Sequence, residues 1–154
     1  WPGRLQRLQE GQLYTRLRRA GWAGELWLDG GHNEAAAQML AHWAVKRYTQ
    51  QNASINIICG MLNTKAADLF FQAFSINNVN ACFHMVPIPH QENSYLPKDL
   101  QNLAAQSGYA SRAYQNIEVA LDAIASKGDN APVLICGSLY LAGWVLRDFP
   151  QSKT

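Results

Sequence analysis

The fold is decided by the stretch Glu25-Leu26-Trp27-Leu28-Asp29-Gly30-Gly31-His32-Asn33. Its first four residues are apolar after the glutamate, which is typical of a short buried strand in a parallel sheet. Asp29 follows where this strand would end, and the two glycines after it permit backbone angles that a residue with a Cβ resists. Asn33 is a good N-cap, so a helix is expected to begin directly after the turn. The nine residues therefore predict a strand, a tight turn and a helix in succession.

The same turn is a candidate functional site. In an open α/β sheet, ligands bind beyond the carboxyl ends of the strands, and this turn would bring an acid, a flexible backbone and the imidazole of His32 to that edge. A titratable ring there is a common functional choice. In the alternative interpretation, Asp29 and Asn33 only satisfy backbone groups and His32 is solvated, because Asp and Gly are ordinary turn residues. The residue types leave both interpretations open.

Composition indicates one globular domain. The chain has 154 residues, of which 48% are hydrophobic and 16% are charged, which allows a sizeable core and excludes a disordered protein. The formal net charge is only +2, and the basic cluster of Arg16, Arg18 and Arg19 lacks the interleaved aromatic residues of a nucleic-acid platform. No apolar run approaches the roughly 20 residues that span a bilayer. We therefore expect neither a nucleic-acid nor a membrane partner.

The three cysteines, Cys59, Cys82 and Cys136, lie in or beside apolar, strand-like runs. Their number is odd and they show no CxxC or Cys/His spacing, so neither a metal site nor a redox role is expected. A cysteine in such a run behaves as a small hydrophobe. Reduced core thiols indicate a cytoplasmic protein.

Strands and helices are expected to alternate along the rest of the chain, which argues for βαβ units and a parallel sheet. Residues 1–24 are less clear, because 4–8 and 12–17 could be two extended segments, with a helix over 12–19 as the alternative. Further strands are predicted at 55–59, 81–86, 111–114 and 133–136. Helices are predicted at 34–48, at 67–74, from Pro97 to the break at Gly108, from the cap at Asn116 to near Gly128, and after Ser138.

Helical spacing also predicts which side chains face the core. Met39 and Trp43 share an apolar face of the helix over 34–48, where core packing is expected rather than a ligand platform. Leu69 is expected to face inward from the helix over 67–74, and Leu139 is expected to share one side of the last helix with Ala142 and Leu146. The helical pattern breaks at residues 52–54.

Three small-residue turns follow predicted strands: residues 29–32, Gly60 with the loop that carries Lys65, and Gly137-Ser138. In a parallel sheet these turns would lie at the same edge. Gly137-Ser138 combines a glycine, a hydroxyl and the N–H groups of a helix start, which suits an anion, and Lys65 could add a cation. Alternatively, Ser138 is a simple N-cap and Lys65 is solvated. Because the sequence has no GxGxxG, GxxxxGK[ST] or GxSxG motif, it indicates a partial site that is completed from elsewhere.

Five segments resemble the C-terminal domain of folylpolyglutamate synthase/dihydrofolate synthase, in the Mur ligase superfamily. They are WPGRLQ at 1–6, ELWLDGGHN at 25–33, GMLNTK at 60–65, VPIP at 86–89 and ICGSLYL at 135–141. They follow the order of the family over nearly the whole chain, and the combination of DG(A/G)HN with GSLY is specific. The chain is therefore identified as a member of this family.

The resemblance implies an α/β, Rossmann-like domain with a mostly parallel six-stranded sheet, one antiparallel strand and helices on both faces. It implies that residues 1–154 are a single domain of a larger, monomeric, cytoplasmic ligase. An N-terminal P-loop ATPase domain would carry the Mg²⁺ ligands and most of the folate site. The parent would use ATP to join L-glutamate to dihydropteroate or folate through an acyl phosphate. The isolated domain is expected to fold, to be inactive and to bind ATP weakly or not at all.

The same resemblance implies roles for individual residues. The expected residues are Asp29, Gly30, Gly31 and Asn33 for the nucleotide, His32 and Arg4 for catalysis, and Ser138, Gly137 and Lys65 for the substrate, with no metal ligand in this domain. A cation near the phosphates would offset the charge that builds on the phosphoryl oxygens. The chain departs from the common pattern where Ala66 follows Lys65, since relatives often have Asp there, and where Gly31 replaces a frequent alanine.

A stand-alone binding or regulatory module with a ligase-like fold is the alternative function. The length of the native gene product separates the two, because the ligase requires a P-loop domain upstream. A Mur-type ligase acting on a peptidoglycan precursor fits less well, because the chain contains both ELWLDGGHN and GSLY.

Overall fold

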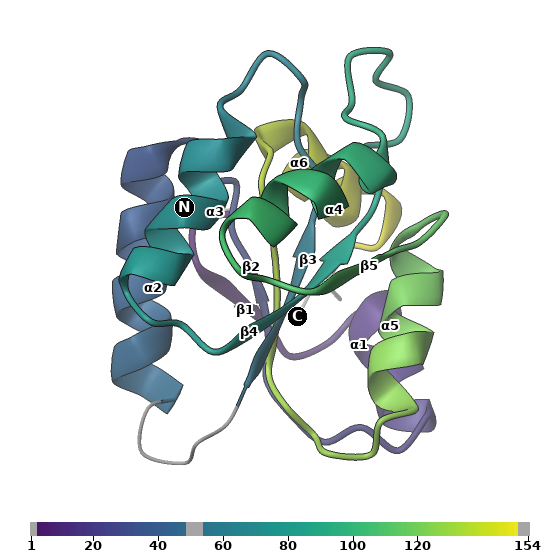
Figure 1. Cartoon of the computed structure of the whole chain (residues 1–154). Helices are drawn as coiled ribbons and strands as arrows, with labels where there is room; N and C mark the ends of the chain where they lie inside the picture. The colour runs from purple at the N-terminus through teal and green to yellow at the C-terminus, as the bar shows by residue number, and fades with distance from the viewer. Residues whose placement is uncertain (1–2, 49–53, 151–154) are drawn as a thin grey trace.

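The structure, a computed structural model, describes residues 3–48 and 54–150. Within these ranges six strands form one sheet in the order β1-β2-β6-β3-β4-β5. β1 is antiparallel to β2, and all other neighbours are parallel (Figure 1). The strands are β1 (Gln6–Leu8), β2 (Leu26–Leu28), β3 (Ile55–Cys59), β4 (Ala81–Met85), β5 (Ser111–Ala113) and β6 (Val133–Cys136).

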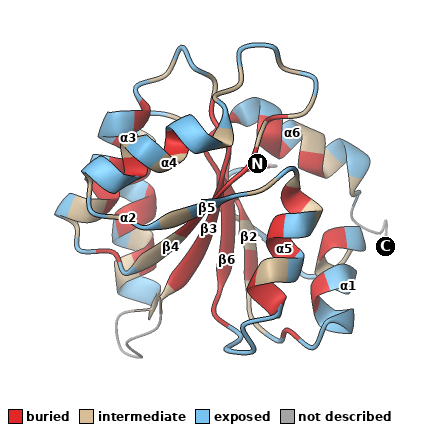
Figure 2. Ribbon diagram, turned by 45° about the vertical axis from the view of Figure 1, so that its right-hand side comes forward, coloured by how far each residue is buried: buried red, intermediate tan, exposed pale blue. Residues whose placement is uncertain are grey.

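Helices cover both faces of this sheet. The helices α2, α3 and α4 pack on one face, and α1, α5 and α6 pack on the other (Figure 2). They are α1 (Gln12–Arg19), α2 (Glu34–Tyr48), α3 (Ala67–Ile76), α4 (Pro97–Gln106), α5 (Ile117–Ala125) and α6 (Leu139–Asp148). The α/β, Rossmann-like fold with a mostly parallel sheet and one antiparallel strand is therefore confirmed.

The central strands are apolar throughout because both of their faces are covered. In β3, Ile57 belongs to the core beneath α2 and α3, whereas its neighbour Ile58 belongs to the core beneath α5 and α6. Leu134 and Ile135 of β6 divide between the two cores in the same way. Successive side chains of a strand point to opposite faces, so an uninterrupted hydrophobic run is the expected sequence of a strand buried on both sides.

The N-terminal segment corrects one expectation. An extended segment is present as β1, but residues 12–17 are helical, as the alternative held. Leu13 and Leu17 are four residues apart and are both buried on one side of α1, so their helical spacing outweighs the extended interpretation. Residues 1–2 and part of the break expected at 52–54 lie outside the described residues.

Three apolar side chains of the helices are exposed. The exposed fractions of Met39, Leu69 and Leu139 are 49%, 37% and 63%, so the expectation of core packing was wrong for Met39 and Leu69, and Leu139 does not share the burial of Ala142. In each helix the residues that contact the sheet lie one or two positions away, where alanines and phenylalanines pack more closely. The buried residues are Ala37, Leu40, Ala41 and Ala44 in α2, Ala67, Phe70, Phe71, Ala73 and Phe74 in α3, and Leu141, Ala142 and Val145 in α6.

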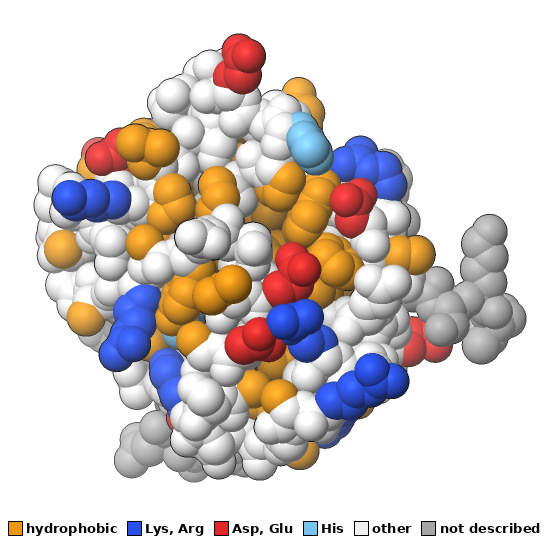
Figure 3. Space-filling model, turned by 90° about the vertical axis from the view of Figure 1, so that its right-hand side faces the viewer, with side chains coloured by type: hydrophobic (Ala, Val, Ile, Leu, Met, Phe, Trp, Pro, Cys, Tyr) orange, Lys and Arg blue, Asp and Glu red, His pale blue; other side chains and the backbone are white. Residues whose placement is uncertain are grey.

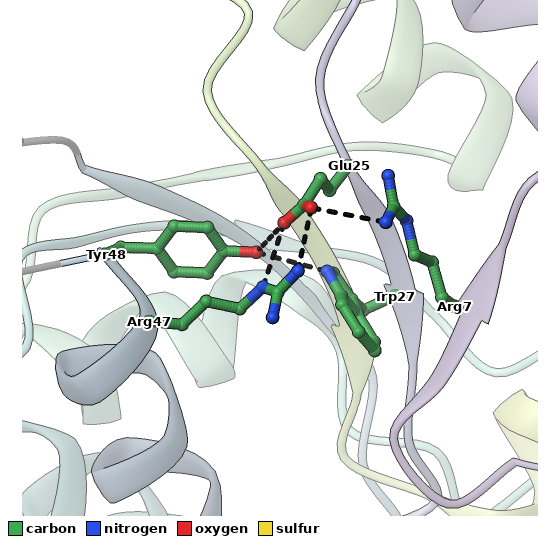
Figure 4. Close-up of polar contacts among 5 residues, drawn as sticks. All are labelled: Arg7, Glu25, Trp27, Arg47 and Tyr48. Atoms are coloured by element: carbon green, nitrogen blue, oxygen red, sulfur yellow. Dashed lines mark hydrogen bonds and ion pairs between the residues drawn. The ribbon is translucent and has the colours of Figure 1, made fainter.

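A charged cluster ties β1 and α2 to the start of β2 (Figure 4). Arg47 donates two hydrogen bonds to the carboxylate of Glu25, over 3.0 and 2.9 Å, and the hydroxyl of Tyr48 donates a third over 2.6 Å. Arg7 of β1 lies 3.4 Å from the same carboxylate. These contacts, above all the bonds from Arg47, lower the pKa of Glu25 to about 2. The folded chain therefore favours the ionised form of this carboxyl.

Replacing Glu25 by Gln is expected to lower the free energy of unfolding by about 1 kcal/mol at pH 7, because two arginines lose a partly solvated charged partner. The pKa of Glu25 is lower in the folded chain than its ordinary value of 4.5. Its contribution to stability is therefore present above that pH and is lost as the pH falls toward about 2. Urea unfolding of the domain at pH 7 and at lower pH measures the difference between wild type and variant, which should shrink on acidification.

Glu92→Gln, in an exposed loop, is the control and should change stability little at either pH. A Glu25→Gln variant as stable as the wild type at pH 7 would contradict the role given to this carboxylate.

Candidate functional site

The three turns expected at one edge of the sheet meet there. The strands β2, β6 and β3 are neighbours in that order and run parallel, so the turns that follow them are adjacent. The N–H of Gly137 donates to the carbonyl of Gly31 over 2.9 Å, and the N–H of Gly60 donates to the carbonyl of Cys136 over 3.3 Å. Backbone hydrogen bonds therefore join the end of β6 to the turns on both sides of it.

Gly137 occupies a position that requires a glycine. Its φ is +111°, a value that residues with a Cβ rarely adopt. A Cβ there would lie 2.6 Å from the carbonyl oxygen of Gly60 and 3.0 Å from the Sγ of Cys59. The turns after β3 and β6 therefore approach each other through bare backbone.

Asp29 shapes the first turn from inside the protein, where its exposed fraction is 4%. Its Oδ1 accepts a hydrogen bond from the N–H of Gly31 over 2.6 Å, and its Oδ2 accepts one from the N–H of Leu5 over 2.8 Å. A Cβ on Gly31 would lie 2.7 Å from Oδ1 and 2.8 Å from the Cβ of Ala36, so in this chain the turn is fitted to glycine. The hydrogen bonds of Asp29 are those that the purely structural interpretation assigned to it.

His32 and Asn33 lie between the glycines of the first turn and the start of α2. Oδ1 of Asn33 accepts a hydrogen bond from the N–H of Ala36 over 2.8 Å, which confirms it as the N-cap. His32 is half-buried, and its Nδ1 lies 3.2 Å from the carbonyl oxygen of Gly30. When Nδ1–H donates to that carbonyl, Nε2 is left for a ligand.

Two hollows open on this edge and share His32 and Leu139. The larger, of about 240 Å³, is lined by Ala36, Met39, Leu139 and six predicted residues, Arg4, Asp29, Gly30, Gly31, His32 and Asn33. The smaller, of about 90 Å³, is lined by Leu62, Leu139, Tyr140 and four predicted residues, His32, Lys65, Gly137 and Ser138. All nine residues that the sequence singled out therefore line one hollow or the other.

Ser138 is the N-cap of α6. Its Oγ accepts hydrogen bonds from the N–H groups of Tyr140 and Leu141 over 3.0 and 3.4 Å, and its exposed fraction is 3%. The N-cap interpretation is confirmed. The hydroxyl can also donate its O–H in a further hydrogen bond. Lys65 lines the same hollow from the loop after β3.

Sequence reasoning missed the apolar rim of these hollows. Met39, Leu139 and Tyr140 have exposed fractions of 49%, 63% and 56%. A Cβ on Gly30 would lie 2.5 Å from Cδ2 of Leu139, so this leucine packs directly on the glycine backbone. The position of Leu139 and Tyr140 immediately after the Ser138 cap could have revealed them, since the first turn of a helix that starts at the binding edge borders the ligand.

Two larger hollows lie away from this edge. One, of about 640 Å³, follows α1 beside Arg16 and Arg19, and the other, of about 390 Å³, lies beside Glu25 and Arg47. Arg16 is paired with Asp122 over 2.7 Å, and Arg47 is paired with Glu25. On the face that Figure 3 shows, basic side chains are interspersed with acidic ones rather than gathered in one patch. The turns at the carboxyl edge therefore remain the candidate site.

Within residues 3–48 and 54–150, no group of three or more His, Cys, Asp or Glu side chains is arranged to hold a metal ion. Cys59 and Cys136 are buried, and burial raises the pKa of both thiols. No helix in the same part of the chain is both long enough and apolar enough to cross a membrane.

The sequence and the fold are similar to those of known proteins. Residues 14–148 match the family described as "Dihydrofolate synthetase, C-terminal domain". The chain belongs to this family. A relative from Schizosaccharomyces pombe, named "Probable dihydrofolate synthetase", is 26% identical to the chain over 153 residues, which cover 96% of the chain and 34% of the relative. The resemblance drawn from the five sequence segments is thereby confirmed.

The fold of this dihydrofolate synthetase domain is also found in solved structures. Mycobacterium tuberculosis folylpolyglutamate synthase complexed with ADP has a TM-score of 0.75 at 20% identity, over 100% of this chain and 33% of that one. The bifunctional folylpolyglutamate synthase/dihydrofolate synthase of Yersinia pestis, complexed with AMPPNP and a Mn ion, has a TM-score of 0.68 at 18% identity, over 96% of this chain and 31% of that one. The chain spans about a third of the length of the curated relatives that it matches.

Replacing Gly137 by Ala is expected to lower the free energy of unfolding by about 2–4 kcal/mol. The methyl group would collide with the carbonyl of Gly60, and the positive φ would become strained. Gly143→Ala is the matched control, because Gly143 is exposed on α6 and a Cβ there meets nothing within 4 Å. The control should stabilise the helix by up to about 1 kcal/mol. Urea unfolding measures both, and a Gly137→Ala variant as stable as the wild type would contradict the close packing of the turns.

Proposed function

We propose that this chain is the C-terminal domain of an ATP-dependent ligase that joins L-glutamate to dihydropteroate, to folylpoly-γ-glutamate or to both. Membership of the dihydrofolate synthetase family supports an enzyme of folate metabolism. Two synthases of the same fold are complexed with ADP or AMPPNP, which supports a nucleotide as the second substrate. The observation that carries the proposal is that all nine predicted residues line two adjoining hollows at the carboxyl edge of the sheet.

The larger hollow is assigned to the nucleotide. Gly30 and Gly31 present backbone without side chains, which permits close approach by a phosphate or ribose. Arg4 supplies a guanidinium that would offset negative charge on the phosphoryl oxygens. Asp29 borders this hollow from inside the turn, where each of its carboxylate oxygens accepts a backbone N–H. Asn33, the N-cap of α2, also lines this hollow.

The smaller hollow is assigned to the incoming glutamate. Ser138 can donate its O–H, and it lies with Gly137 at the start of α6, where the helix dipole favours a carboxylate. Lys65 adds an ammonium group from the facing loop. A substrate with a carboxylate is therefore matched by the chemistry of this hollow.

His32 lies where the two hollows meet, which is where the proposed reaction takes place. A carboxylate of the pteroate or folate attacks the γ-phosphate of ATP, which breaks the bond to the β-phosphate, releases ADP and forms an acyl phosphate. The amine of glutamate then attacks the acyl carbon, loses a proton and releases inorganic phosphate as the amide forms. Such chemistry depends mainly on positioning and charge stabilisation. The Nε2 of His32 is available for either reacting group because Nδ1 faces the carbonyl of Gly30.

The divalent metal is assigned mainly to a part of the enzyme outside this chain. Mg²⁺ prefers carboxylate oxygens and water. Of the described residues that line the two hollows, Asp29 is the only acid, and both of its oxygens hold backbone N–H groups. We therefore place the Mg²⁺ ligands in the N-terminal P-loop ATPase domain that the family resemblance implies. From the same resemblance we propose that the whole enzyme is monomeric and cytoplasmic.

ATP is expected to bind the isolated domain with a dissociation constant of about 1 mM or weaker. The hollows of about 240 and 90 Å³ fall below the roughly 300–1,000 Å³ of typical ligand pockets, so half of the nucleotide would remain in solvent. Isothermal titration with ATP measures this affinity. Micromolar binding by the domain alone would show that it holds a complete nucleotide site.

In the full-length protein, replacing His32 by Ala is expected to lower kcat about 100-fold, because a positioned proton-transfer or charge-stabilising group is lost. The assay is glutamate-dependent ADP release with dihydropteroate and, separately, with tetrahydrofolate. His42→Ala is the matched control, since His42 is exposed on α2 outside both hollows. Unchanged kinetics in His32→Ala would remove this residue from the mechanism. A wild-type protein that released no ADP with either substrate would favour the non-catalytic module.

A further inference from the structure

Leu5 has a backbone conformation that its residue type disfavours. Its φ is +44°, in the left-handed region that is unfavourable for a residue with a Cβ. The other described non-glycine residues with positive φ are Asn78, His90 and Asn130, all of types that tolerate this region. A leucine keeps such a conformation only where its surroundings impose it.

The turn after β2 imposes this conformation from both sides of Arg4. The N–H of Leu5 donates to Oδ2 of the buried Asp29 over 2.8 Å. The carbonyl of Gly3 accepts a hydrogen bond from the N–H of Gly30 over 2.6 Å. The backbone before and after Arg4 is thus bonded to the same two-residue segment.

This anchoring fixes the backbone that carries Arg4. The φ of Leu5 sets the direction of the chain just before β1, which begins at Gln6. With the backbone held on both sides, Arg4 lines the larger hollow together with His32.

We infer that Asp29 is a positioning residue for Arg4, which it holds in the cleft through the backbone of Leu5. This role rests on the proposed function, because it explains how the cation of that site is aimed. It differs from a direct contact between Asp29 and the nucleotide in one measurable respect. An indirect effect of Asp29 disappears when the guanidinium of Arg4 is removed, whereas a direct contact acts whether or not Arg4 is present.

A double-mutant cycle in the full-length protein tests this coupling. Asp29→Asn keeps the size of the side chain but replaces one acceptor oxygen with an amino group, which cannot accept an N–H. It should lower kcat about tenfold when Arg4 is present and less than about twofold in the Arg4→Ala background. The KM for ATP should change less than about twofold. Multiplicative losses, or a rise confined to the KM for ATP, would overturn the inference in favour of a direct contact.

A rescue and a control complete the cycle. Leu5→Gly in the Asp29→Asn background should recover about threefold in kcat, because glycine adopts the left-handed conformation without strain. Failure to recover would show that the conformation of Leu5 is not the link. Asp129→Asn is the matched control, since Oδ1 of Asp129 accepts the N–H of Ala131 over 3.1 Å in the loop before β6, and it should leave kcat within about twofold of the wild type.

Hydrogen exchange of the Leu5 amide in the wild-type protein keeps the inference testable if Asp29→Asn does not fold. This amide should be protected because it is bonded to a buried carboxylate, and exchange at the rate of an unstructured peptide would overturn the inference. The two proposals fail separately. Absence of glutamate-dependent ADP release in the wild type would contradict the proposed ligase function. Protection of the Leu5 amide would still test whether Asp29 holds the backbone next to Arg4.

Discussion

The close approach of three backbone turns at the carboxyl edge of the sheet is the constraint on which the structure depends. Gly137 bonds to the turn after β2 and leaves no space for a side chain against Gly60. β6 is the last strand in the sequence, yet it lies between β2 and β3 in the sheet. The turn after β2 therefore reaches its final neighbours only when the C-terminal strand has entered the sheet. Completion of the core and assembly of the candidate site are the same event.

The two edges of the sheet use charge differently. At the start of β2, the carboxylate of Glu25 is bonded by Arg47 and Tyr48 and lies beside Arg7, so the charges satisfy one another and join a strand edge to a helix. At the carboxyl edge, among the described residues, no acidic side chain lies within ion-pair distance of Arg4 or Lys65. Cations that lie beside glycine backbone without an acidic partner suit an anionic ligand, whereas the cluster at the opposite edge suits stability.

The strands and turns could be predicted because their physical causes are local. An apolar run that ends in small residues suffices to predict β3 or β6 and the edge at which each one ends, so the three turns could be placed together from the sequence. Arg4 could be named only through the resemblance to the family. Which side of each helix packs against the sheet could not be predicted in the same way. α2 carries alanines on several sides, so its pattern does not decide whether Met39 or Ala37 meets the sheet. That choice depends on how closely the helix packs, which is a tertiary property, and the place of Met39 at the rim of the site was missed for this reason.

For the turn after β2, the structural and the functional interpretations are complementary. Asp29 is buried and bonded to backbone, as a purely structural residue would be. One of those bonds ends on Leu5, which has a positive φ and is preceded in the chain by Arg4, a residue that lines the larger hollow. A residue that only stabilised its own turn would not need to accept a hydrogen bond from a residue 24 positions earlier in the chain. The sequence shows an acid followed by glycines, whereas only the fold reveals the long-range hydrogen bond to Leu5. Through this bond, the inferred positioning role connects the stability of the turn with the placement of the Arg4 charge.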